Sequence, residues 1–143
     1  MRIVGISGSL RTGSFNAALL RAAVEECPKQ ATLFVTPEYN NSIPGVFKNA
    51  IDWMTRPPAD VPRIFRGRAV GLIGASPGAF GTVLSQVAWL PIFRTLGMRP
   101  WFGQQLYVGG ASKVFDASGR LADDAIRARL RKYMEGFVEF VAA

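Results

Sequence analysis

The stretch "IVGISGSLRTGSFNAALLRAA", residues 3–23, places an apolar run, a polar loop and an amphipathic run directly after one another. The apolar pattern over residues 2–7 predicts a strand, and residues 14–27 predict a helix capped by Ser14. Between them, residues 7–16 carry four serine or threonine hydroxyls, two glycines, an arginine and an asparagine. Backbone N–H groups at a strand-to-helix turn bind anions. The loop therefore predicts a site for a small anion, with nucleotide, dinucleotide and flavin phosphates as candidates.

The rest of the chain continues this alternation. Apolar runs predict strands over 31–36, 68–76 and 99–108. A helix is predicted from Pro44 onward, with Phe47, Ala50, Ile51 and Met54 on one face. A second is predicted over about 82–96, where Pro91 should cause a kink or break near Val87. A third is predicted over 119–142. Uniformly apolar strands alternating with helices predict a parallel sheet covered on both faces. Residues 1–143 then form one α/β domain, and its ligand lies where the polar loops gather, at the carboxyl ends of the strands.

Composition excludes several kinds of chemistry. The 143 residues contain no histidine and a single cysteine, Cys27, so histidine-based triads, a usual zinc or haem site and an internal disulfide are excluded. Cys27 is expected to be an inert thiol. No apolar run approaches the ~20 residues of a membrane span, and the N-terminus does not resemble a signal peptide, so we expect a soluble cytoplasmic protein.

The chain is basic, with 17 lysines and arginines against 10 acidic residues and a formal net charge of +7. This balance admits nucleic acid, a membrane surface or small anions as partners. One basic cluster, Arg56, Arg63, Arg66 and Arg68, follows the predicted site in the sequence. Our hypothesis is that it attracts an anionic substrate.

The first loop lacks the two common phosphate-binding patterns. No lysine follows its glycines, and Gly5, Gly8 and Gly13 do not have the spacing of a dinucleotide fingerprint. A loop in which hydroxyls and amides predominate suits a terminal phosphate monoester, as in FMN. The alternative is a capped helix after a glycine-rich turn, without any ligand.

Four segments carry a family resemblance: "GISGSLRTGSFNAALLRAA", "TPEYNNSIPGVFKNAIDW", "GASPGAFGT" and "FDASGRLADD". In this order they resemble the NADPH-dependent FMN reductases, a family that includes flavodoxin-like quinone, chromate and azo reductases. The resemblance runs through nearly the whole chain. It implies a flavodoxin-like, doubly wound parallel sheet in three α/β/α layers.

The resemblance also implies the site residues. Those that would hold the FMN phosphate are Ser9, Arg11, Ser14, Phe15 and Asn16. Those that would lie along the isoalloxazine ring are Pro37, Glu38, Tyr39 and Asn40. Ser76 would close the site from the third loop, where Gly78 and Gly81 would allow close backbone approach.

The implied activity is hydride transfer from NADPH, or NADH, through FMN to a quinone, chromate, azo or similar small acceptor. Such chemistry needs no side-chain acid or base, so we expect no catalytic residue and no metal. A homodimer or homotetramer is implied, without a nucleic-acid or membrane partner. Two alternatives remain open: a flavodoxin-like one-electron carrier that binds FMN without NADPH turnover, and a basic nucleic-acid-binding domain.

One departure from the family is large. The family carries a further strand and helix, roughly 30 residues or more, where only "PKQAT" separates the first helix from "LFVTPEYN". Joining the first helix directly to the family's third strand would make a rare left-handed crossover. Three explanations are open: a tract omitted near residues 31–34, with Leu33–Phe34 a false join; a deletion in which the first helix changes face; or an exchange of elements with a partner. We favour omission.

Overall fold

A computed structural model describes residues 4–25 and 32–143 as one parallel sheet with helices on both faces. The sheet runs β1 (Val4–Ser7), β2 (Thr32–Val35) and β3 (Ala69–Ala75), and β3 then pairs with both β4 (Arg99–Pro100) and β5 (Leu106–Val108). Every pairing in this sheet is parallel. The predicted α/β class is therefore confirmed.

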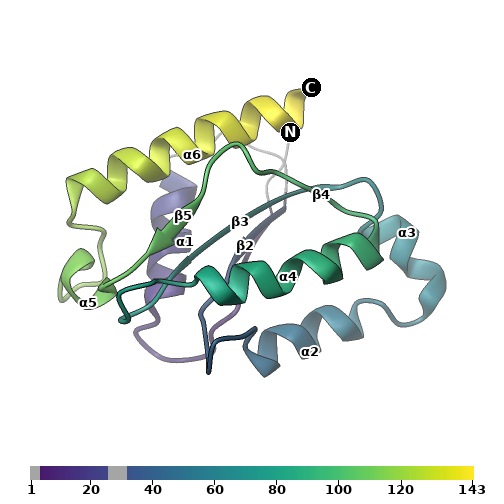
Figure 1. Cartoon of the computed structure of the whole chain (residues 1–143), viewed down its shortest axis with the longest axis horizontal. Helices are drawn as coiled ribbons and strands as arrows, with labels where there is room; N and C mark the ends of the chain where they lie inside the picture. The colour runs from purple at the N-terminus through teal and green to yellow at the C-terminus, as the bar shows by residue number, and fades with distance from the viewer. Residues whose placement is uncertain (1–3, 26–31) are drawn as a thin grey trace.

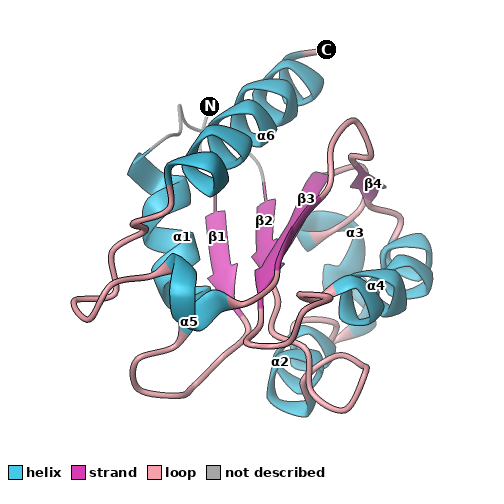
Figure 2. Cartoon of the chain, turned by 60° about the vertical axis from the view of Figure 1, so that its left-hand side comes forward, coloured by secondary structure: helices cyan, strands magenta, loops and turns pink. Residues whose placement is uncertain are grey.

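The helices form two layers (Figures 1 and 2). One face is covered by α1 (Phe15–Glu25), α5 (Ala111–Val114) and α6 (Asp124–Ala142). The other is covered by α2 (Gly45–Trp53), α3 (Val61–Ile64) and α4 (Val83–Leu96), with a short 3₁₀ turn, η1 (Pro58–Asp60), before α3. Alternation along β2 joins the layers, because Leu33 and Val35 enter the first core and Phe34 the second.

The crossovers explain how the short connection is accommodated. The order β1, β2, β3 proceeds in one direction across the sheet, yet α1 lies on one face and α2 on the other. Two such connections must have opposite hands. The connection through α4 continues in the same direction on the α2 face, so it has the same hand as the connection through α2. Because such connections are almost always right-handed, we assign the left hand to the β1–α1–β2 unit.

α1 therefore keeps the face it shares with α6, so a change of face is not the explanation. Leu33 and Phe34 are consecutive members of β2 and pair with consecutive residues of β1 and β3. β2 is thus one continuous strand. Residues 26–31, including Cys27, lie outside the described residues. Among the described strands, β1 has a single neighbour, and Val4 is 59% exposed at this edge.

The predicted strand 99–108 is wrong as one element. Pro100 pairs with Val70, and Leu106 pairs with Ile73. The five residues between Pro100 and Leu106 therefore lie opposite only two residues of β3, and they do not pair with that strand. The hydroxyl of Tyr133 on α6 fills this gap: it accepts from the Leu72 N–H at 2.7 Å and donates to the Leu72 carbonyl at 3.2 Å. A side chain from another layer replaces the missing ladder bonds.

Two helix predictions also need correction. α4 continues through Pro91 without the expected break. On α2 only Phe47 and Ile51 of the predicted apolar face are buried, whereas Ala50 is exposed and Met54 is 39% exposed. The start of α6 agrees with the prediction of acidic residues there, since Asp123 caps it by accepting from the Ile126 N–H at 2.9 Å.

An aromatic cluster fixes the first loop against the second layer. Phe34, Phe47, Trp89 and Phe93 pack with ring centroids 4.8–5.8 Å apart. A Cβ placed on Gly8 would lie 2.0 Å from the Phe47 ring, so only glycine permits this approach. The loop after β1 is therefore seated on the core.

Candidate functional site

The loops after β1, β2 and β3 meet at the carboxyl edge of the sheet around a shallow hollow of about 50 Å³. Its lining is Ser9, Arg11, Ser14, Phe15, Asn16, Pro37, Glu38, Tyr39, Ala75, Ser76 and Pro77. Nine of the ten residues predicted from the sequence are in this set, and Asn40 is not. The hollow is far smaller than the 300–1,000 Å³ of a typical ligand pocket, so it has room for only one end of a ligand as large as FMN.

Three serine hydroxyls of the hollow have the same arrangement. The Oγ of Ser14 accepts from the Ala17 N–H at 3.3 Å, that of Ser9 from the Arg11 N–H at 3.4 Å, and that of Ser76 from the Gly78 N–H at 3.3 Å. Because each oxygen is already an acceptor for the backbone, each hydroxyl hydrogen remains available to donate. Hydroxyl donors converging on a hollow fit an anion.

The start of α1 adds donors of another kind. Within residues 4–25 and 32–143, the N–H groups of Phe15 and Asn16 donate no hydrogen bond, as is usual for a first helical turn. Arg11 is exposed, with its guanidinium carbon 5.7 Å from the centre of the Phe15 ring. Backbone N–H groups, hydroxyls and a guanidinium form a donor set of the kind that phosphate requires, so these residues fit the phosphate of FMN.

Asn16 has a role that sequence reasoning missed. Its side chain is buried, and it donates to the Ala75 carbonyl at 2.9 Å and accepts from the Ala75 N–H at 3.0 Å. Both ends of the amide are thus engaged by the end of β3. The side chain joins the first loop to the third, and only the backbone N–H of Asn16 remains for an anion.

The second loop is held by Glu38. A Glu38 carboxylate oxygen accepts from the Ser85 N–H at 3.0 Å, in the first turn of α4. This satisfies a donor that the helix itself leaves unpaired. The carboxylate therefore positions the second loop against α4, although Glu38 also lines the hollow.

Asn40 serves the turn instead of the hollow. Tyr39 and Ser42 exchange backbone hydrogen bonds at 3.2 and 3.0 Å, and Asn40 and Asn41 between them have φ of 50° and 62°. Asparagine tolerates this left-handed conformation, and a two-residue hairpin turn of this kind requires it. The two successive asparagines of the "YNNS" sequence could have predicted that Asn40 lies at the tip of a turn.

The third loop differs in part from expectation. Gly81 has φ of 63°, and a Cβ there would lie 3.0 Å from the backbone of Tyr107 and Val108. Its close approach is therefore to β5. Gly78 has open space around it, apart from the Ser76 hydroxyl.

The arginine cluster lies away from the hollow. Arg66 and Arg68 directly precede β3, and the Arg68 carbonyl accepts from the Arg99 N–H at 2.9 Å, so they lie at the amino edge of the sheet. Arg63 pairs with Asp60 at 3.0 Å. None of these arginines lines the hollow, so the hypothesis that the cluster attracts an anionic substrate stays a prediction.

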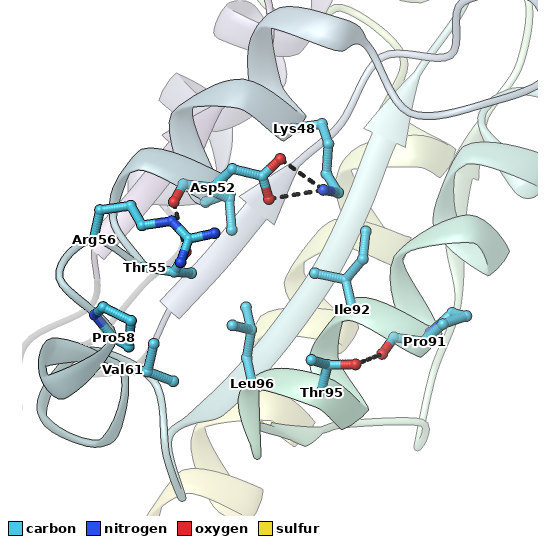
Figure 3. Close-up of a pocket in the computed structure, with 11 residues that line it drawn as sticks. Lys48, Asp52, Thr55, Arg56, Pro58, Val61, Pro91, Ile92, Thr95 and Leu96 are labelled. Atoms are coloured by element: carbon cyan, nitrogen blue, oxygen red, sulfur yellow. Dashed lines mark hydrogen bonds and ion pairs between the residues drawn. The ribbon is translucent and has the colours of Figure 1, made fainter.

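A larger cavity of about 410 Å³ lies between the carboxyl ends of α2 and α4 (Figure 3). Apolar side chains including Val61, Ile92 and Leu96 line it, and the Lys48–Asp52 ion pair at 2.7 Å lies at its rim. Because α2 and α4 begin near the three loops and run back along the sheet, this cavity is separate from the hollow.

Two kinds of feature were not found in the described ranges. No cluster of three or more histidine, cysteine, aspartate or glutamate side chains is arranged for a metal ion there. Nor does any of the helices described there have the length and apolar character needed to cross a bilayer.

Comparison with known proteins agrees with this geometry. The sequence pattern described as NADPH-dependent FMN reductase matches residues 30–113. An NAD(P)H-dependent FMN reductase of Pseudomonas aeruginosa is 32% identical, with 94% of this chain and 92% of that protein aligned. This chain belongs to the NADPH-dependent FMN reductase family. It is therefore an NAD(P)H-dependent flavin oxidoreductase whose cofactors are FMN and NAD(P)H.

Two further proteins are similar to this chain, one in sequence and one in solved structure. A quinone reductase of Pseudomonas putida is 36% identical over 79% of this chain and 57% of its own length. A solved structure, the flavoenzyme NAD(P)H:(acceptor) oxidoreductase FerB from Paracoccus denitrificans, superposes with a TM-score of 0.86 and 25% identity, covering 99% of this chain and 97% of that one. The P. aeruginosa alignment runs over 173 positions while this chain has 143 residues, so that relative has positions without a counterpart here.

Proposed function

We propose that this enzyme reduces quinones, with chromate, azo compounds and similar small oxidants as further acceptors, by passing hydride from NADPH or NADH through FMN. The observation that carries the proposal is the convergence of three loops on a hollow lined by unused donors. Relatives named quinone reductase support the acceptor class.

Each part of the hollow has a role in this proposal. Hydroxyls of Ser9 and Ser14, the Arg11 guanidinium and the backbone N–H groups of Phe15 and Asn16 hold the FMN phosphate. Pro37, Glu38, Tyr39 and Ser76, which line the rest of the hollow, would contact the flavin ring. Asn40 does not line the hollow, and its role in this proposal is to shape the turn of the second loop.

Bound FMN would supply the redox chemistry, which is two-electron transfer between NAD(P)H and the acceptor. The overall reaction balances as NAD(P)H, a proton and a quinone giving NAD(P)⁺ and a hydroquinone. The chain's own residues bind and orient. The Asn16–Ala75 and Glu38–Ser85 hydrogen bonds keep the three loops in register, so the site needs little rearrangement to bind.

We also propose a cytoplasmic homodimer or homotetramer, because the NAD(P)H supply lies inside the cell and α2 and α4 expose apolar side chains. Val46 is 47% exposed, Trp53 69%, Met54 39% and Val87 54%. Light scattering after size exclusion should give a multiple of 15.6 kDa. Trp53→Glu should shift the mass toward the monomer, and an unchanged monomeric mass for both proteins would contradict the proposal.

The test of the redox function is an anaerobic NADPH titration of FMN-loaded protein, followed at the visible flavin band. We expect bleaching, then recovery when a quinone is added. Bound FMN that NADPH does not bleach would favour the one-electron carrier instead. Absence of FMN binding would overturn both readings.

A matched pair of variants tests the phosphate site. Arg11→Gln removes a charge beside the hollow and should raise the Kd for FMN about 10-fold, since charge-assisted hydrogen bonds contribute about 1.5–3 kcal/mol. Arg129→Gln removes an exposed charge on α6 and should leave the Kd within about 2-fold. Equal effects would indicate that Arg11 acts only through net charge.

A further inference from the structure

Three exposed apolar side chains lie on the second loop, the third loop and the start of α4, and two of them, Phe80 and Leu84, take no part in the proposed FMN contacts. Phe80 is 85% exposed, Tyr39 48% and Leu84 48%. We name these three residues the apolar rim. Apolar surface exposed to water is unfavourable by roughly 25 cal/mol per Å². Exposed apolar side chains beside a site therefore commonly mark a surface that a ligand covers when it binds.

One hydrogen bond brings the rim together. The Glu38 carboxylate accepts from the Ser85 N–H at 3.0 Å, so the neighbours Tyr39 and Leu84 lie on either side of a direct contact between the second loop and α4. Phe80 precedes the first residue of α4 by three positions, in the loop whose Ser76 and Pro77 line the hollow. Tyr39 thus lines the hollow itself, whereas Phe80 and Leu84 are close in the chain to Pro77 and to the Glu38–Ser85 contact.

The chemistry of the rim differs from that of the phosphate end. Donors for an anion come from the first loop and the start of α1, whereas the rim adds two aromatic rings and one aliphatic side chain. Such a surface contacts a planar apolar molecule and has little to offer a small hydrated ion. The rim stands at the end of the site where the proposal places the flavin ring.

We infer that Tyr39, Phe80 and Leu84 contact the ring of an aromatic acceptor while it takes electrons, and so favour apolar quinones over small hydrophilic oxidants. This inference rests on the proposed function and names specificity residues for it. The electron balance is that of the quinone reaction above: two electrons and two protons convert the quinone to its hydroquinone.

The test measures flavin reoxidation without NAD(P)H, so that it does not depend on the donor. FMN-loaded protein is photoreduced anaerobically and mixed with 2-methyl-1,4-naphthoquinone or, separately, with two equivalents of ferricyanide. We compare Phe80→Ser, Leu84→Ser and the double variant with Phe102→Ser, whose side chain is 64% exposed on the segment between β4 and β5.

We expect the second-order rate with the naphthoquinone to fall about 5- to 30-fold in each rim variant, because loss of a partly covered apolar side chain weakens binding by about 1–2 kcal/mol. The ferricyanide rate and the Kd for FMN should stay within about 2-fold, and Phe102→Ser should change neither rate. Rim variants that lose both rates equally, or lose neither, would overturn the inference. Failure of NADPH to bleach the wild-type flavin would instead count against the proposed function, since reoxidation is measured without it.

Discussion

Replacing Asn16 by alanine tests whether this side chain joins two loops or binds the ligand. The substitution removes both hydrogen bonds to Ala75, at 2.9 and 3.0 Å, and leaves a buried N–H and a buried carbonyl unpaired. Each orphaned buried group costs about 1–3 kcal/mol. We expect the free energy of unfolding to fall by about 2–4 kcal/mol.

The measurement is urea unfolding of the protein without FMN. With an m-value of about 2 kcal/mol/M, the midpoint should fall by about 1–2 M. Asn49→Ala is the matched control, since Asn49 is exposed on α2 and should change stability by less than about 0.5 kcal/mol.

The competing interpretation, in which the Asn16 amide binds the FMN phosphate, predicts the opposite pattern. The FMN-free midpoint would then equal that of the control, and only the Kd for FMN would rise. That outcome would refute the positioning role. A fall in both midpoint and affinity agrees with it, because loosened loops bind FMN less well.

Three further outcomes follow from the packing. Burial raises the pKa of Tyr133 above its ordinary 10.0. The free energy of unfolding should therefore keep its full value below pH 10 and fall as the pH rises further. Tyr133→Phe should reduce this fall, measured as urea midpoints from pH 8 to 11. Gly81→Ala should cost at least about 2 kcal/mol, against about 1 for Gly13→Ala, since both glycines have positive φ but only Gly81 faces backbone at 3.0 Å; equal losses would contradict this. Lys48→Ala breaks the exposed ion pair with Asp52. It should lower the free energy of unfolding, measured by thermal unfolding, by no more than about 0.5 kcal/mol.

Short-range patterns predicted much of the fold and most of the candidate site. The strand, loop and helix at residues 3–25 are local features, because a period of two or 3.6 and a capping serine act within a few residues. The hollow also followed from order alone, since parallel strands place their carboxyl ends at one edge.

The sequence-based predictions failed where contacts between residues distant in sequence determine the structure. The outer strand looked continuous from 99 to 108, yet Tyr133 from α6 supplies the bonds that allow it to open. Sequence order alone also did not show that the arginines at 66 and 68 lie at the other edge of the sheet.

By itself, the sequence of this protein determined the element types, the family and the three polar loops, because backbone propensity and side-chain pattern are encoded locally. Only the tertiary structure decided that Asn16 turns to Ala75, that Glu38 turns to Ser85 and that α1 stays beside α6 in a left-handed unit. Those choices depend on which buried groups meet across layers, and a buried polar atom takes the partner that packing brings within reach.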